Sequence, residues 1–322
     1  MRQIAAFLVL AVCTALPAFA QEVTRLPLVG VLNINTVASN EPIATIMRDA
    51  LAALGDIDGK SIRLDFRLAE GDAGRFPQLA EALVRDDPAV IVAHGPPAVR
   101  AARRATQTIP IVASVNDLVG SGFIERMARP GRNIPGVSML VSELDAKRLE
   151  VLKEILPSAR RFGLLIETGT RAPAVLQPML DTARALGVAI QNVEASTPAD
   201  FPGAVASFRA GGVEAVNILS STLLFYFHKD LGPLLLQHKL PAICEWREMT
   251  ASGCLASYGT TLRESAAMQA ALIDKMLKGA RPADTPSQQP TKFELVLNLK
   301  VAREIGIAIP PGILARADEV IE

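Results

Sequence analysis

Polar side chains follow several short apolar runs of this sequence, at the points where predicted strands end. In open parallel sheets, ligands bind beyond the carboxyl ends of the strands, where the loops converge. Amides, hydroxyls and exposed backbone favour reversible hydrogen bonding to a small molecule, although each residue could instead form a helix N-cap or a turn. The candidate contacts are Asn35, Thr36, His94, Gly95, Asn116 and Asp117 from the first half of the chain, and Glu167, Thr168, Ser220, Ser221, Trp246 and Tyr258 from the second half.

The acidic and aromatic candidates indicate which ligand groups the site could bind. Asp117 and Glu167 could hold an ammonium group, while hydroxyls and backbone N–H groups at helix starts could hold a carboxylate. Trp246 and Tyr258 could cover an apolar ligand face while their N–H and O–H groups stay hydrogen-bonded, or they could pack around a hinge. Tyr226, which stands between two phenylalanines, is expected to pack at a helix start.

Catalytic motifs are absent from the sequence. There is no Gly-x-Ser-x-Gly elbow, His-Glu-x-x-His pair, Walker loop or dinucleotide-binding glycine pattern, so we expect no catalytic residue and no cofactor. The three histidines have no partner ligands in sequence, which argues against a metal site. An enzyme would have to use Glu167 with Glu245 as acid and base, or His94 with Ser220 or Ser221 as a nucleophile pair.

The elements that would position these side chains occur twice in similar form. Residues 28–32 and 162–166 are matching apolar strands, and Phe-Pro opens a helix at 76–77 and again at 201–202. Strands alternate with amphipathic helices throughout, as in parallel α/β proteins; the first of these helices is expected over about 42–54. Two such units predict an α/β fold with two doubly wound parallel-sheet lobes, joined by a hinge, with a ligand cleft between them.

The expected lobes are each assembled from two stretches of the chain. The first lobe takes residues 27–140 plus about 259–281, and the second takes residues 141–258 plus about 290–322. A proline-rich polar link over 281–289 separates the last two stretches. At 322 residues, half of them apolar and 20% charged, the chain is long enough for two domains. The 33 basic and 33 acidic side chains balance and form no basic stripe, which argues against a nucleic-acid partner.

The N-terminus predicts a secretory signal peptide over residues 1–20. A basic residue precedes an apolar run, and Ala18-Phe19-Ala20 is the small-x-small pattern that precedes cleavage. A lipoprotein anchored through Cys13 is disfavoured because Val12 stands where a small residue is needed. Since no later apolar run reaches about 18 residues, no membrane insertion is expected. Outside the cytoplasm, Cys244 and Cys254 could form a disulfide or remain two buried free thiols.

Several longer motifs are similar to those of a known family. They lie at residues 128–138, 240–243, 246–248, 257–259, 278–284, 289–296 and 309–322. On these motifs the chain resembles the periplasmic substrate-binding family of ABC transporters, which is related to tryptophan- and phenylalanine-binding proteins. This resemblance implies a type I periplasmic-binding fold, a periplasmic location, a monomer, and lobes that close on a solute for delivery to an ABC permease and its ATPase.

The combined hypothesis is a non-catalytic, extracytoplasmic solute-binding protein that traps a small organic molecule, such as an amino acid or an aromatic acid. Two alternatives remain. A ligand-sensing adaptor would use the same cleft and pass its signal to a membrane receptor, and a secreted α/β enzyme would transform its ligand.

Overall fold

A five-stranded parallel sheet forms the centre of the first lobe. The computed structural model describes residues 25–139, 141–170 and 173–322. The strands of this sheet are β1 (Leu28–Asn33), β2 (Arg63–Leu68), β3 (Val90–His94), β4 (Ile111–Val115) and β5 (Gly136–Ser138). They lie in the order β2-β1-β3-β4-β5, and every neighbouring pair is parallel. Strands β1 and β3 are buried along their whole length, because helices cover both faces.

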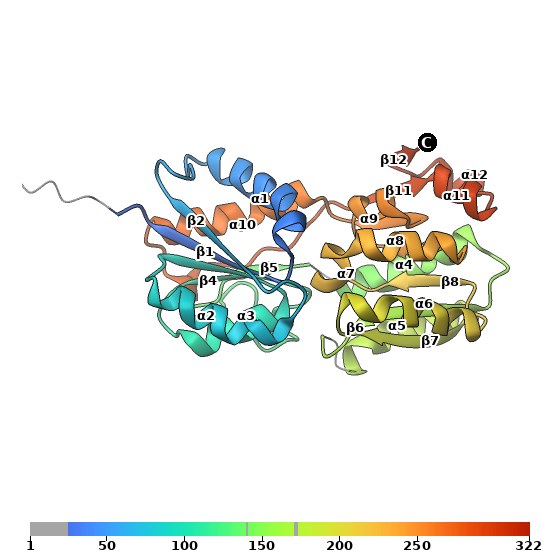
Figure 1. Ribbon diagram of the computed structural model, residues 1–322, viewed down its shortest axis with the longest axis horizontal. Helices are drawn as coiled ribbons and strands as arrows, with labels where there is room; N and C mark the ends of the chain where they lie inside the picture. The colour runs from blue at the N-terminus through green and yellow to red at the C-terminus, as the bar shows by residue number, and fades with distance from the viewer. Residues whose placement is uncertain (1–24, 140, 171–172) are drawn as a thin grey trace, which may run out of the picture.

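Helices cover the first sheet in two pairs. The helical segments of this lobe are α1 (Val37–Ala52), η1 (Ala73–Arg75), α2 (Phe76–Arg85), α3 (Gly95–Ala105), α10 (Leu262–Leu277) and η3 (Pro282–Asp284). Figure 1 shows α1 beside α10 on one face and α2 beside α3 on the other. Helix α10 therefore packs on the first sheet although it comes late in the chain.

A seven-stranded sheet forms the second lobe. Its strands are β6 (Arg161–Glu167), β7 (Ala189–Ala195), β8 (Ala215–Ile218), β9 (Ala242–Cys244), β10 (Ala256–Gly259), β11 (Glu294–Asn298) and β12 (Glu319–Ile321). They lie in the order β12-β11-β10-β9-β8-β6-β7, and the one antiparallel pair among these described strands is β10 with β11. The protein is thus an α/β molecule with two lobes, each wound around its own sheet.

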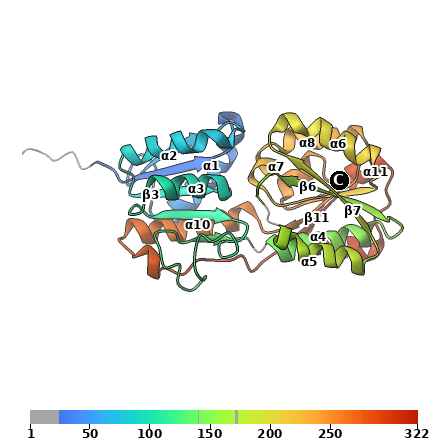
Figure 2. The ribbon, with the colours of Figure 1, turned by 90° about the horizontal axis from the view of Figure 1, so that it is seen from below.

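The helices of the second lobe also lie on both faces of their sheet. They are α4 (Val141–Ile155), α5 (Pro173–Ala185), η2 (Pro198–Asp200), α6 (Phe201–Ala210), α7 (Thr222–Tyr226), α8 (His228–Gln237), α9 (Arg247–Ser252), α11 (Leu299–Ile305) and α12 (Pro311–Leu314). Figure 2 shows α6 and α8 on one side of this lobe and α4 and α5 on the other. No helix of the described residues is long and apolar enough to cross a membrane.

The sequence repeat corresponds to the same local structure in both lobes. Helices α2 and α6 each follow a short 3-10 turn and begin with a Phe-Pro pair. Phe76 and Phe201, which open the two helices, are fully buried. Gly30 in β1 and Gly163 in β6 each lie directly under a side chain of that helix, where an added Cβ would collide. The repeat therefore reflects the same packing in both lobes. In each lobe a glycine in the strand lets the helix lie close to the sheet.

The chain passes between the two sheets three times: between β5 and α4, between β10 and α10, and between η3 and β11. Residues 287–288 still belong to the first sheet, since Ser138 N–H donates to the Gln288 carbonyl at 2.9 Å beside β5. A continuous cluster of buried apolar side chains extends from the first sheet into α7 and α8 of the second lobe. The two lobes are consequently in direct contact.

Candidate ligand-binding cleft

A cavity of about 830 Å³, its open mouth included, lies between the two lobes. Helix α1, the ends of β3 and β4, and helix α10 line it from the first lobe, and the ends of β6 and β9 with helix α7 line it from the second. The lining residues are Ile43, Ile46, Met47, His94, Gly95, Pro96, Ser114, Val115, Asn116, Met139, Glu167, Thr170, Ser221, Thr222, Phe225, Tyr226, Glu245, Trp246, Leu262, Ser265, Ala266 and Gln269.

Aromatic rings form the wall of the second lobe. Phe225 packs edge-on against Tyr226, with ring centroids 4.9 Å apart, and against Trp246 at 5.6 Å. Trp246 is only 9% exposed, so these rings are largely withdrawn from solvent. Apolar side chains of α1 and α10 line the opposite wall. An apolar or aromatic ligand group would be enclosed from both sides.

A chain of hydrogen bonds holds His94 in one neutral tautomer. The Asn33 amide NH₂ lies 3.0 Å from His94 Nδ1, and His94 Nε2 lies 2.7 Å from Gln269 Oε1. Asn33 Oδ1 accepts from the Ile34 N–H at 2.9 Å, which fixes the amide so that its NH₂ group faces the histidine. Nδ1 therefore accepts and Nε2 carries the proton. Burial lowers the pKa of His94, which favours this uncharged form.

Two hydrogen bonds join the lobes at the cavity. Asn33 also donates to the Tyr226 hydroxyl at 2.6 Å, and Asn116 Nδ2 donates to the Ser220 carbonyl at 2.8 Å. Between them the backbone of Gly95 (φ +83°) approaches Thr222 so closely that a Cβ on Gly95 would lie 2.6 Å from Thr222 Oγ1. Only glycine combines this backbone angle with this approach.

Two buried carboxylates lie in the wall of the cavity. Glu167 and Glu245 are 7% and 5% exposed, and the Leu223 N–H donates to Glu167 Oε2 at 3.4 Å. The described wall is therefore mainly apolar, with carboxylates at the ends of β6 and β9 that can accept hydrogen bonds from a ligand.

Six of the residues expected to contact ligand line this cavity. They come from five different strand ends, so the rule that loops converge at the carboxyl edge brings them together across both lobes. These six residues are His94, Gly95, Asn116, Glu167, Ser221 and Trp246.

Three expected contacts from the first lobe lie outside the cavity wall and make local hydrogen bonds. Asn35 is buried, and its amide donates to Asn40 Oδ1 at 3.0 Å. Thr36 is the N-cap of α1 and forms a capping box with Ser39. Asp117 accepts the N–H groups of the turn that follows it. These three residues have the cap and turn roles that such residue types often have.

Three expected contacts from the second lobe also lie outside the wall. Thr168 is exposed in the turn after β6. Ser220 is buried behind the wall, where its hydroxyl accepts from Arg148 Nη2 at 2.6 Å. The Tyr258 ring packs on Phe293, with centroids 6.2 Å apart, away from the cavity.

Further residues take part in the hydrogen bonds at the cavity where the sequence analysis placed none. Asn33 and Gln269 hold His94, and Tyr226, expected only to pack, makes a contact between the lobes. Asn33 is a polar residue ending an otherwise apolar strand, and Gln269 is a polar residue on the buried face of α10. An amide residue within an otherwise apolar pattern could have indicated these positions in the sequence, because a buried amide requires hydrogen-bond partners.

The two described cysteines are free thiols in the structure, so of the two alternatives the disulfide is not formed. Both are buried, and Cys244 Sγ donates to the Ala256 carbonyl at 3.3 Å. Burial raises the pKa of Cys254 well above its usual value and keeps it protonated. Cys13 and the expected signal peptide lie outside the described residues. No group of three or more His, Cys, Asp or Glu side chains suited to a metal ion occurs among the described residues.

Comparison with known proteins identifies the family. The profile of the family described as ABC transporter substrate binding protein matches residues 29–321. The chain belongs to this family. A tyrosine-binding protein of Clostridioides difficile (strain R20291) is 26% identical over 251 residues, which is 77% of this chain and 72% of that protein.

Several solved protein structures share the fold of this chain. A conserved domain protein from Vibrio cholerae superposes with a TM-score of 0.84 at 26% identity, covering 92% of this chain and all of that one. An ABC domain from Streptococcus pneumonia, in complex with L-Trp, gives a TM-score of 0.82 at 23% identity, with the same coverage. A ligand-free, open substrate-binding protein from Clostridium difficile gives a TM-score of 0.63 at 22% identity, covering 92% of this chain and 99% of that one.

Proposed function

We propose that this substrate-binding protein captures an amino acid with an aromatic or large apolar side chain, without altering it, by closing its two lobes around it. On the outer side of the cytoplasmic membrane, the binding protein, a monomer, then delivers the solute to an ABC permease. The ATPase of the transporter works together with this permease. Family membership supports the transport role. The ligand class rests on the cavity and on the related tyrosine-binding protein.

The observation that carries the proposal is the division of the cavity into an apolar part and an acidic part. The rings of Phe225, Tyr226 and Trp246 would enclose the ligand side chain. Glu167 and Glu245 would attract its ammonium group. Ser221 Oγ accepts from the Leu224 N–H at 2.9 Å, so its own proton is free to be donated to the ligand carboxylate.

Contacts between the lobes support closure as the binding mechanism. A ligand shifts an equilibrium between open and closed forms by its differential affinity for the two. The cavity residues come from both lobes, so the full set of ligand contacts would exist only when the lobes are together. The bonds Asn33–Tyr226 and Asn116–Ser220 would form in the same step. The lower TM-score with an open relative than with the L-Trp complex is consistent with this motion.

A thermal-shift series with matched ligands tests the proposal. L-Tyrosine, L-tryptophan and L-phenylalanine are compared with tyramine, which lacks the carboxylate, and with 3-(4-hydroxyphenyl)propionate, which lacks the amine. A ligand at a hundred times its Kd stabilises the folded state by about 2.7 kcal/mol, which corresponds to a rise in Tm of about 4 °C for a protein of this size. We expect this rise with at least one aromatic amino acid, and recovery of the ligand chemically unchanged.

A substitution of Glu167 and a matched control check whether this carboxylate contributes to binding. Glu167→Gln should weaken amino-acid binding by at least tenfold, because it replaces a carboxylate of the cavity wall that the proposal assigns to the ligand ammonium group. Asp117→Asn, in a turn outside the wall, should leave the affinity unchanged. The proposal would be abandoned if the amine-free analogue bound as tightly as tyrosine, or if mass spectrometry showed conversion of the ligand.

A further inference from the structure

A buried ion pair lies directly behind the cavity wall of the second lobe. Arg148 and Asp145, both on α4, form a salt bridge in which neither side chain has more than 1% exposure. Arg148 does not line the cavity. The proposed capture of a solute therefore does not require its charge, and a buried, fixed guanidinium calls for an explanation.

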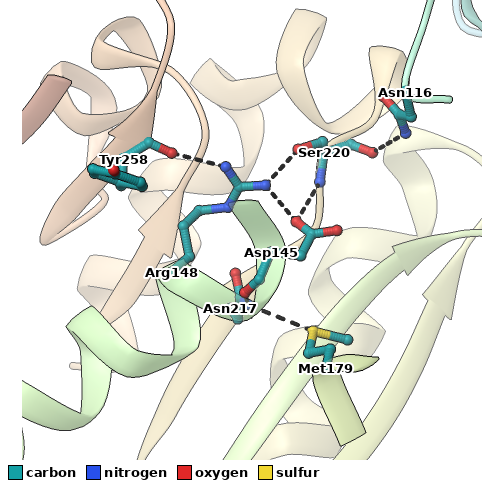
Figure 3. A network of polar contacts seen from close by, with 7 residues as sticks. All are labelled: Asn116, Asp145, Arg148, Met179, Asn217, Ser220 and Tyr258. Carbon is teal, nitrogen blue, oxygen red and sulfur yellow. Dashed lines mark hydrogen bonds and ion pairs between the residues drawn. The ribbon is translucent and has the colours of Figure 1, made fainter. Parts of the chain in front are cut away.

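The guanidinium joins two segments that lie far apart in sequence (Figure 3). Arg148 Nη1 donates to the Tyr258 carbonyl at 2.8 Å, at the end of β10, from which the chain crosses to α10 of the other lobe. Arg148 Nη2 donates to Ser220 Oγ at 2.6 Å. One planar group thus fixes a crossing between the lobes and the loop after β8, and a planar fork can do this because its donors keep fixed directions.

The loop after β8 is one of the parts of the second lobe that contact the first lobe. The Ser220 carbonyl accepts from Asn116 Nδ2 of the first lobe at 2.8 Å, and the next residue, Ser221, lines the cavity. Asp145 adds a second constraint from α4, because the Ser220 N–H lies 3.5 Å from its Oδ1. Helix α4 therefore holds the hydroxyl and the N–H of Ser220. The carbonyl of Ser220 faces the first lobe.

We propose that Arg148 is a positioning residue that holds the Ser220 carbonyl ready for Asn116 and links this contact to the β10–α10 crossing. Arg148 acts through Ser220 and touches no ligand. When the lobes open, Asn116 leaves Ser220, while Arg148 keeps the loop in place for the next closure. The inference rests on closure by the proposed function, and it adds a residue outside the cavity that controls how readily closure occurs.

Distances between the lobes test this role without any ligand. Spin labels on Glu81→Cys of α2 and Arg209→Cys of α6, both exposed positions, report the separation of the lobes. Arg148→Lys keeps the charge beside Asp145 but cannot reach both of its other acceptors, and Ser220→Ala removes the hydroxyl while leaving the ion pair intact. We expect both variants to lose at least half of the short-distance population seen in the unsubstituted protein. Identical distance distributions in variant and unsubstituted protein would overturn the inference.

Binding measured by calorimetry with L-tyrosine as the probe provides the second readout. Ser220→Ala and Asn116→Ala should each weaken binding about tenfold, and the double variant should be no weaker than Asn116→Ala, since both changes disable one contact. A merely structural role of Ser220 predicts additive losses, which would contradict the inference. Lys147→Met, which removes a cation one residue away that pairs with surface Glu150, is the matched control and should bind normally.

Failure of the two proposals gives different results. If L-tyrosine leaves the unsubstituted protein unchanged while the variants still alter the unliganded distances, the proposed ligand class fails and the positioning role stands. If L-tyrosine binds and Arg148→Lys and Ser220→Ala bind it equally well, the positioning role fails and the proposed function stands.

Discussion

At the scale of single residues, the protonation of His94 determines how the cavity wall is organised. Asn33 offers one amide hydrogen to His94 Nδ1 and the other to the Tyr226 hydroxyl. A charged imidazolium would carry a proton on Nδ1 and face the Asn33 NH₂ group donor to donor, so the neutral form is the one that fits. Because Asn33 bonds both groups, the neutral histidine and the contact between the lobes belong to one network.

Tyr226→Phe tests the hydrogen bond between Asn33 and Tyr226, which joins the two lobes. The variant keeps the ring against Phe225 but leaves the Asn33 amide hydrogen without the hydroxyl acceptor now 2.6 Å away. An unsatisfied buried donor costs about 1–3 kcal/mol, and here the cost arises only when the lobes meet. We expect L-tyrosine binding, measured by calorimetry, to weaken about tenfold or more, with little change in the Tm of the unliganded protein.

The chain contains one other tyrosine, which serves as the control. Tyr258→Phe alters a ring that packs on Phe293 outside the cavity and should bind like the unsubstituted protein. Equal loss of affinity in both variants would mean that a general effect on folding, rather than the Asn33 contact, explains the result.

At the scale of elements, the glycine that opens α3 sets how closely the lobes approach. Gly95 has a left-handed backbone (φ +83°) and lies against Thr222 of α7. In Gly95→Ala the new methyl group would overlap the Thr222 hydroxyl and hold the lobes apart. We expect loss of measurable L-tyrosine binding and a larger radius of gyration by X-ray scattering in the presence of ligand.

The control separates steric overlap from backbone strain. Gly122 has a similar angle (φ +69°), and no atom lies within 4 Å of a Cβ built there. Gly122→Ala should therefore cost about 1 kcal/mol of stability, as left-handed alanine does, and should leave affinity unchanged. If Gly95→Ala behaves the same way, the close approach to Thr222 has no part in binding.

Sequence patterns predicted which helices and strands exist better than they predicted where each one begins and ends. The strands of the two sheets could be recognised as continuous apolar runs, because a sheet covered on both faces buries the side chains on both sides of each strand. The first helix begins at Val37, five residues before the expected 42, since Thr36 and Ser39 form a capping box. The Thr36 hydroxyl is used in this cap, and Thr36 does not line the cavity. Strand ends alone cannot distinguish a cap from a ligand contact, because both use the same residue types.

The contacts between lobes could not be predicted from the sequence. Asn33 and Tyr226 are 193 positions apart, and Asn116 and Ser220 are 104 apart. No local pattern connects such residues, since their meeting depends on the relative orientation of two separate sheets. The cavity could be placed at the carboxyl ends of the strands by a general rule, whereas the hydrogen bonds within it required coordinates.

At the scale of the whole molecule, two histidines that folding withdraws from water make stability depend on pH; His94 is buried and His228 is half-buried. Burial lowers the pKa of His94, and it lowers that of His228 on α8 to about 4, with a smaller contribution from Lys229. In the unfolded chain both side chains titrate near pH 6.5. Below that pH the unfolded state binds more protons than the folded state, so acidification favours unfolding.

We therefore expect the free energy of unfolding to be constant above about pH 7 and to fall as the pH decreases from about 6.5 toward 4, where His228 protonates in the folded protein. Urea titrations at half-unit steps would measure this slope. His228→Gln should reduce it between pH 6.5 and 5, leaving the part that comes from His94. Ser252→Ala removes the hydroxyl 2.7 Å from His228 Nδ1 but leaves the imidazole half-buried as before, so its slope should match that of the unsubstituted protein. An unchanged slope in His228→Gln would show that desolvation of this histidine does not control the acid sensitivity.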